Sequence, residues 1–163
     1  MILAAILGSV VVPVATQVQA KKIKETEQLL DDAKEALLGF ALSNSRLPCP
    51  NSVAPFDGLE DAPCPVTEGF LPWATLGLPP TDAWGRLLYY GVTVEFTVTP
   101  IPATACASGG DLDLCDTGNI NVRDTLAGID LVGNAGGGPG APAVIVSTGP
   151  NGLGGRDFVS GVT

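Results

Sequence analysis

Four cysteines, Cys49, Cys64, Cys106 and Cys115, are the residues of this chain with the most predictable chemistry. An even number of cysteines in a small domain rich in glycine and proline favours two disulfides and an oxidising compartment. Three pairings are possible, and the simplest joins Cys49 to Cys64 and Cys106 to Cys115, because each bond then closes a short loop. A loop of about 15 residues contributes roughly 3 kcal/mol in the chain-entropy model. A four-cysteine zinc site is the weaker alternative, because the chain has no Cys-x-x-Cys spacing.

Two further patterns could bind a metal ion or a phosphate, but each lacks an essential part. Asp111, Asp113 and Asp116 begin like a calcium-binding loop, yet Cys115 stands where an EF-hand has its third ligand. The glycine-rich stretch 133–140 lacks the Gly-Lys-Ser/Thr ending of a phosphate-binding loop, and no helix is expected after it. We interpret both as surface loops, and the sequence predicts no metal site and no cofactor.

The residue types that catalyse acid–base or nucleophilic chemistry are also missing. The 163 residues include no histidine, the commonest general base in proteins. The chain has no Gly-x-Ser-x-Gly motif and no candidate base near a serine or cysteine, so we expect no enzymatic activity. The net charge of −9 argues against nucleic acid as a partner, because nucleic-acid binding needs a basic face.

The element that dominates the chain is a long N-terminal helix. Residues 1–15 are apolar or small and carry no charge, and a helical, charge-patterned segment reaches Asn44 without a loop signal. We therefore expect one nearly continuous helix over residues 1–44, disturbed between Gly8 and Pro13, which weaken a helix locally. Its first part, 1–15, would serve assembly or membrane insertion, and its second part, 16–44, is amphipathic.

Three interpretations of the apolar segment compete. A secretory signal peptide needs a basic region before the apolar run, and none is present. A complete transmembrane helix needs about 20 apolar residues, and the run falls short of that length. The third interpretation is an anchor helix that packs against copies of itself and forms the core of a filament. The residues that would form this core are Ile2, Leu3, Ile6, Leu7, Val10, Val11 and Val14.

The amphipathic segment has one apolar face and one charged face. Apolar residues recur at helical spacing, which predicts a face packed on a domain: Ile23, Leu30, Ala33, Leu37 and Ala41, widened by Leu29, Ala36 and Phe40. The charged face is either solvated or meets opposite charges on a neighbouring copy, at an axial offset of about 15 Å. The charges in question are basic Lys21, Lys22 and Lys24 and acidic Asp31, Asp32 and Glu35.

Residues 45–163 form the second unit, a small disulfide-bonded domain that holds nearly all of the 14 prolines and 21 glycines. β-branched and aromatic residues predict strands at 86–90, 92–98 and 143–148, with a fourth at 157–160. Trp73 and Trp84 are expected where this sheet packs on the helix. The predicted fold class is therefore α+β, a long N-terminal helix packed on a small antiparallel β-sheet domain with Gly/Pro-rich loops.

Three segments resemble the type IV pilin and type II secretion pseudopilin family. Residues 35–50 contain Asn-Ser-Arg-Leu-Pro at the expected helix exit. Residues 69–90 contain Leu-Pro-Trp, Gly-Leu-Pro and Asp-Ala-Trp-Gly at spacings similar to the family's. Residues 144–152 resemble the strand and turn that close many pseudopilin domains. The family's processing site and early glutamate are absent, so we expect the leader and about ten residues of the helix to be missing before Met1.

The resemblance implies a structural subunit of a type IV pilus-like or pseudopilus filament outside the cell. Its partners would be copies of itself in a helical homopolymer, the inner membrane before assembly, and the pilus or secretion machinery. The alternative is a membrane-anchored minor pilin or a surface module for binding or adhesion. In either case the resemblance implies a location in an extracellular filament or at the cell surface.

Overall fold

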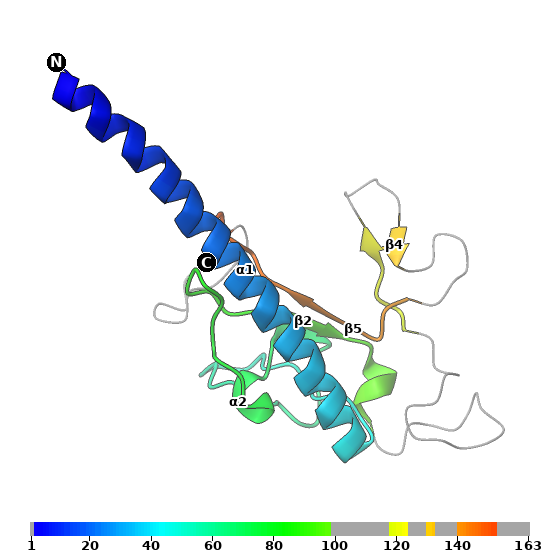
Figure 1. The fold of residues 1–163 in the computed structure, drawn as a ribbon. Helices are drawn as coiled ribbons and strands as arrows, with labels where there is room; N and C mark the ends of the chain where they lie inside the picture. Colours follow the sequence, from blue (N-terminus) through cyan, green and yellow to red (C-terminus); the bar gives the residue numbers. More distant parts are fainter. Residues whose placement is uncertain (1, 99–117, 124–129, 133–139, 153–163) are drawn as a thin grey trace.

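The computed structural model describes residues 2–98, 118–123, 130–132 and 140–152, and the side chains of residues 15–98, 118–122 and 140–152. Helix α1 (Ile2–Asn44) runs over 43 residues, which confirms the long N-terminal helix. In Figure 1 its second half lies against the other elements, and its first half extends beyond them. The helix continues through Gly8 and Pro13, so the disturbance predicted there does not interrupt it.

Three short antiparallel strands form the main sheet, in the order β1 (Glu68–Phe70), β2 (Tyr89–Val92) and β5 (Ala143–Val146). A separate antiparallel pair joins β3 (Val122–Arg123) to β4 (Asp130–Val132). One long helix beside a small antiparallel sheet confirms the α+β class. Strand β5 also confirms the strand predicted at 143–148 in a shorter form, whereas 157–160 lies outside the described residues.

The strands predicted at 86–90 and 92–98 are only partly correct. Gly91, expected between two strands, lies inside β2, and Val94–Thr97 forms the 3-10 helix η1 instead of a strand. The residue types there favour a strand, but non-local packing prevails. The N–H of Phe96 donates to the carbonyl of Thr93 at 3.1 Å, and this turn brings the Phe96 side chain into the core.

The second half of α1 packs on the main sheet through one row of side chains. Leu29, Ala33, Leu37 and Ala41 are all buried and recur every fourth residue, which places them on one face of the helix. The sheet and the loops contribute the rest of this core: Leu47, Leu71, Leu88, Tyr90, Val92 and Phe96. The amphipathic pattern of the sequence is therefore confirmed for this part of the helix.

The pattern fails at Ile23, which is 48% exposed although it was predicted on the packed face. The first buried side chain of α1 among the described residues is Thr26, whose Oγ1 accepts a hydrogen bond from the N–H of Ala83 at 3.3 Å. Ile23 lies about one turn before Thr26. It is therefore on the packed side of the helix, but the domain does not extend that far along α1. The periodicity of apolar residues predicts which side of a helix is packed. It does not predict where along the helix the packing partner ends.

Disulfide Cys49–Cys64 is present, with the Cα atoms 5.1 Å apart, and confirms one predicted pair. Cys106 and Cys115 lie outside the described residues. The loop closed by this disulfide holds Gly58 against the indole of Trp73, the first residue of helix α2 (Trp73–Leu76), where a Cβ on Gly58 would approach to 2.2 Å. The role predicted for Trp73 and Trp84 between sheet and helix stays a prediction.

An ion pair ties the end of α1 to the same loop. Arg46 donates two hydrogen bonds to the carboxylate of Glu60, at 2.7 and 2.8 Å, and the N–H of Cys49 donates a third at 3.1 Å. The hydrogen bonds from Arg46 hold the pKa of Glu60 below its usual value, against the effect of burial. Nearby, Tyr90 donates its hydroxyl to the carbonyl of Pro48 at 3.1 Å, and burial raises the pKa of this phenol.

Candidate functional site

The part of α1 that makes few contacts with its own domain is the first candidate site. Side chains from Ala15 to Glu25 are exposed, except for a half-buried Lys22. The helical backbone continues from there back to Ile2, so Ile2–Glu25 extends for about 36 Å at 1.5 Å per residue. Figure 1 shows this half of the helix projecting past the sheet.

The residues predicted to form a filament core lie in this projecting half of α1. They share an apolar character and a helical backbone: Ile2, Leu3, Ile6, Leu7, Val10, Val11 and Val14. Their side chains are outside the described set, so their contacts stay a prediction. What the structure adds is their position, on a helix that leads away from the domain.

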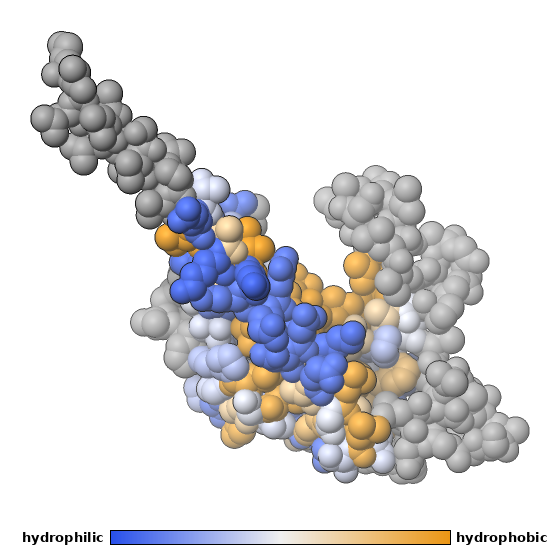
Figure 2. All heavy atoms as spheres, viewed as in Figure 1, coloured by the Kyte–Doolittle hydropathy of each residue, from blue (hydrophilic) through white to orange (hydrophobic). Residues whose placement is uncertain are grey.

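A charged band covers the exposed face of α1, and Figure 2 shows it as a hydrophilic strip along the helix. Within this band Lys21 and Glu25 form an exposed ion pair at 3.5 Å, and Gln28 donates to Asp32 at 2.9 Å. Within the described part of the chain, five of the six predicted inter-subunit residues form no ion pair: Lys22, Lys24, Asp31, Asp32 and Glu35. Their charges are therefore available to a neighbouring molecule.

Sequence reasoning missed an apolar groove between α1 and β5, of about 430 Å³. Strand β5 is an edge of the main sheet. The lining is mostly aliphatic, with one basic residue: Leu30, Lys34, Leu37, Leu38, Leu47, Pro142, Ala143 and Ile145. Leu38 of this lining is 51% exposed, and Leu42, about one turn further along α1, is 82% exposed. Their apolar character was visible in the sequence, but nothing local indicated which face the sheet leaves uncovered.

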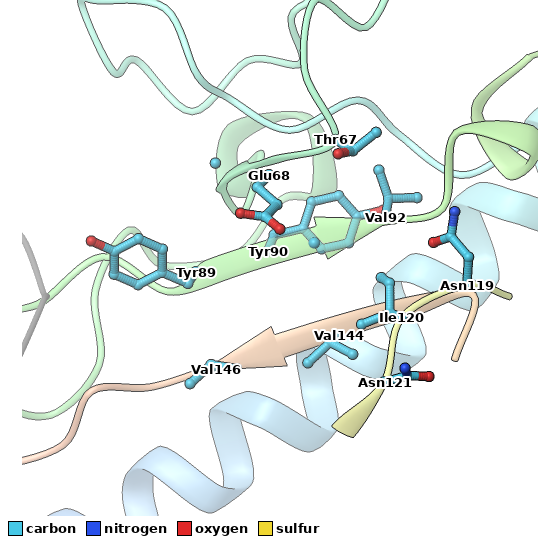
Figure 3. A pocket seen from close by; sticks show the side chains of 12 residues that line it. Thr67, Glu68, Tyr89, Tyr90, Val92, Asn119, Ile120, Asn121, Val144 and Val146 are labelled. Atoms are coloured by element: carbon cyan, nitrogen blue, oxygen red, sulfur yellow. The ribbon is translucent and has the colours of Figure 1, made fainter. Parts of the chain in front are cut away.

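A second groove missed by sequence reasoning lies on the face of the main sheet opposite α1, and we call it the outer-sheet groove. Its volume is about 470 Å³. Figure 3 shows Tyr89 at one end and Asn119 at the other, with Glu68 between them and α1 behind the sheet. The only sequence signal for it was Gly91, a glycine between two runs of strand-forming residues.

The other patterns raised by the sequence add no site. The aspartates at 111, 113 and 116 lie outside the described residues, as does most of the glycine-rich stretch 133–140. Within the described ranges, no group of three or more acidic or cysteine residues is arranged to hold a metal ion. In the same ranges no helix combines the length and hydropathy needed to cross a membrane.

Comparison of the chain with protein-family models, with curated proteins and with solved structures finds no match.

Proposed function

We propose that this chain is the structural subunit of a type IV pilus-like or pseudopilus filament and that it polymerises through α1. The observation that carries the proposal is the projecting half of the helix. A helix packs stably when an apolar face is covered, but among the α1 side chains that the structure describes, which begin at Ala15, the buried ones start only at Thr26. Residues 15–25 are therefore available to lipid or to other copies, and the proposal extends this to the apolar residues before them.

The energetics of the apolar segment support self-association. Burying one medium-sized aliphatic side chain contributes about 1.5–3 kcal/mol, so the seven residues predicted in the core represent roughly 10–20 kcal/mol per subunit before entropy costs. These seven residues occupy about half of the helix circumference, and the residues on the other half, such as Ala4, Ala5 and Val12, are also uncharged, so no side of the segment is charged. Several neighbours are therefore needed to cover them, which favours a bundle of helices over a simple dimer.

The charge pattern of α1 supports a staggered arrangement. Basic Lys22 and Lys24 precede acidic Asp31 and Glu35 along the same helix, and none of them has an ion-pair partner in the described part of its own chain. Sliding one copy along another by about ten residues, or about 15 Å, brings opposite charges together. Such a contact joins two different patches and leaves both ends open, so it propagates into a filament.

A surface module for binding or adhesion is the second candidate, and the outer-sheet groove favours it. A mixed polar and apolar groove on a rigid sheet is the usual setting of a ligand site. The two functions differ in copy number, because a filament shaft needs many subunits whereas a tip or receptor needs few. Quantifying this chain in isolated surface material separates them.

Detergent removal from the purified full chain tests the filament proposal. Replacing Val10 and Val11 by Asp puts charges into the predicted core, and we expect the double variant to form no filaments in negative-stain microscopy. The wild type should form filaments whose subunits are offset by about 15 Å. Normal filaments from the Val10→Asp/Val11→Asp variant would contradict the proposal.

The matched control makes the same change on the domain. Val53 and Val66 are 56% and 45% exposed, so Val53→Asp/Val66→Asp adds the same charge away from α1 and should assemble like the wild type. Circular dichroism and non-reducing peptide mapping then show that both variants keep the folded, disulfide-bonded domain. Loss of filaments in the control variant would mean that net charge, rather than the helix, governs assembly.

A further inference from the structure

The main sheet has two faces with different surroundings. One face packs on α1 through Tyr90 and Val92, and the side chains of alternate residues point the opposite way. On that outer face Glu68 lies opposite Gly91, and Phe70 lies opposite Tyr89. Segment 119–121 lies over the same face and completes the wall of the outer-sheet groove.

The charge of the groove excludes one class of ligand. Its lining contains Glu68 but no lysine or arginine, and the whole chain lacks histidine. Phosphate, sulfate and carboxylate groups need cationic or clustered N–H donors, so an anionic ligand does not suit this groove. A neutral or a cationic ligand remains.

The aromatic ring at one end of the groove is held in place by two others. Tyr89 packs on Phe70 with ring centroids 5.1 Å apart, and Phe70 packs edge-on against Phe56 at 5.0 Å. Phe56 belongs to the loop that disulfide Cys49–Cys64 closes. A ring fixed in this way loses little conformational entropy when a ligand stacks on it.

The polar group at the other end is fixed as well. The buried Thr93 hydroxyl accepts from the N–H of Asn119 at 3.0 Å, and its single proton has two acceptors within reach, Asn119 Oδ1 at 3.0 Å and the carbonyl of Ala141 at 3.2 Å. Oδ1 of Asn119 lies toward Thr93, so the Nδ2 group, on the other side of the carboxamide, is directed away from Thr93. Asn119 is exposed, so it offers an oriented donor at the groove.

Gly91 keeps the floor of the groove low. A Cβ built on it would lie 3.7 Å from Ile120 Cδ1, an ordinary contact. The site could therefore hold an alanine, and the glycine is not required by backbone conformation at this point. Its lack of a side chain leaves space between Tyr89 and Asn119, flanked by Val144 of β5.

We propose that the outer-sheet groove binds a neutral saccharide. The apolar face of a sugar ring packs on Tyr89, and its hydroxyl groups bond to the acceptor oxygens of Glu68 and the donor nitrogen of Asn119. Hydroxyl groups need both donors and acceptors, and the groove supplies both. A cation needs acceptors alone and is better held by several rings or carboxylates, which makes a saccharide the better match.

Titration of the full chain in a sugar-free detergent, followed by ¹H–¹⁵N NMR, tests this inference. The probes are cellohexaose, maltohexaose and chitohexaose, each neutral, with trilysine as the cationic comparison. We expect at least one neutral probe to shift the amide signals of Gly69, Gly91 and Ile120. Failure of all three neutral probes at millimolar concentration, or saturable binding of trilysine alone, would overturn the proposal.

Variants connect binding to the groove. Tyr89→Ala and Gly91→Ala should each weaken binding at least about tenfold, the first by removing the ring and the second by raising the floor, whereas Tyr89→Phe should bind nearly as well as the wild type. Saccharide binding by Glu68→Gln is compared with binding by Glu95→Gln, because Glu95 is an exposed glutamate of η1 outside the groove. Equal binding by Tyr89→Ala and the wild type, with both folded, would show that the saccharide binds elsewhere.

Discussion

At the scale of single residues, the ion pair between Arg46 and Glu60 joins the end of α1 to the disulfide-bonded loop. Each side chain is only 19% exposed, so water screens the pair less than it screens surface pairs such as Lys21–Glu25. The third hydrogen bond, from the N–H of Cys49, joins the pair to the disulfide. The Glu60 carboxylate thus connects the end of α1 to the loop that the disulfide closes.

Glu60→Gln should lower the free energy of unfolding by about 1–3 kcal/mol near neutral pH. Because the folded pKa of Glu60 lies below its usual value of 4.5, its contribution is full above that value and is lost as the pH falls through the folded pKa. The variant and the wild type should therefore converge in strong acid. Urea unfolding across this range measures the difference.

The control for this variant is Glu95→Gln, a change of the same kind at an exposed residue without an ion pair in the described part of the chain. Its stability should follow the wild type at all pH values. A pH-independent loss in Glu60→Gln would contradict the assigned role of the carboxylate.

At the scale of elements, helix α1 depends on close approach to the sheet. Ala33 is fully buried in the middle of the packed row, so Ala33→Leu forces larger atoms into an occupied space and should cost about 1–3 kcal/mol. Ala20 lies on the same helix but is exposed. Ala20→Leu should leave stability nearly unchanged, because alanine and leucine have similar helix propensities. Chemical denaturation of both variants checks the packing, and equal stability would argue against it.

The same element shows what the sequence could and could not predict. The helix and its packed face follow from local spacing, so Ala33, Leu37 and Ala41 were placed correctly. The strands are short and their partners are distant in the chain, so composition assigned Val94–Thr97 to a strand. The hydrogen bonds that decide this turn involve Thr93, Asn119 and Pro142, which no local pattern connects.

The grooves could not be predicted for the same reason. The outer-sheet groove is made by Glu68, Tyr89 and Asn119, which lie on three different segments and become neighbours only through the register of the strands. By contrast, the short loop between Cys49 and Cys64 favoured, among three possible pairings, the disulfide that the structure contains. Local chemistry was readable from the sequence, whereas surfaces built from distant segments required the fold.

At the scale of the whole molecule, we expect the stability of the small domain to depend on its disulfide. Opening Cys49–Cys64, which spans 15 residues, with the Cys49→Ser/Cys64→Ser double variant should cost roughly 3 kcal/mol. Thermal unfolding of the oxidised chain and the variant gives this difference. Unchanged stability would mean that the loop is held by Arg46 and Glu60 without help from the disulfide.

Peptide mapping without reductant tests the second predicted disulfide. We expect one peptide linking Cys106 to Cys115, since an even number of cysteines and a short loop favour it. Free thiols at these two residues would contradict the prediction and leave the domain with a single covalent link among its cysteines.

The row of rings from Phe56 through Phe70 to Tyr89 has a consequence for the order of events in the life of this chain. Phe56 is tethered by Cys49–Cys64, so the ring proposed to meet the saccharide acquires its full support only after oxidation. A newly made chain in a reducing compartment lacks that support. If the chain is exported to form the filament proposed above, recognition would thus mature with export, and a subunit would not be fully competent at its place of synthesis.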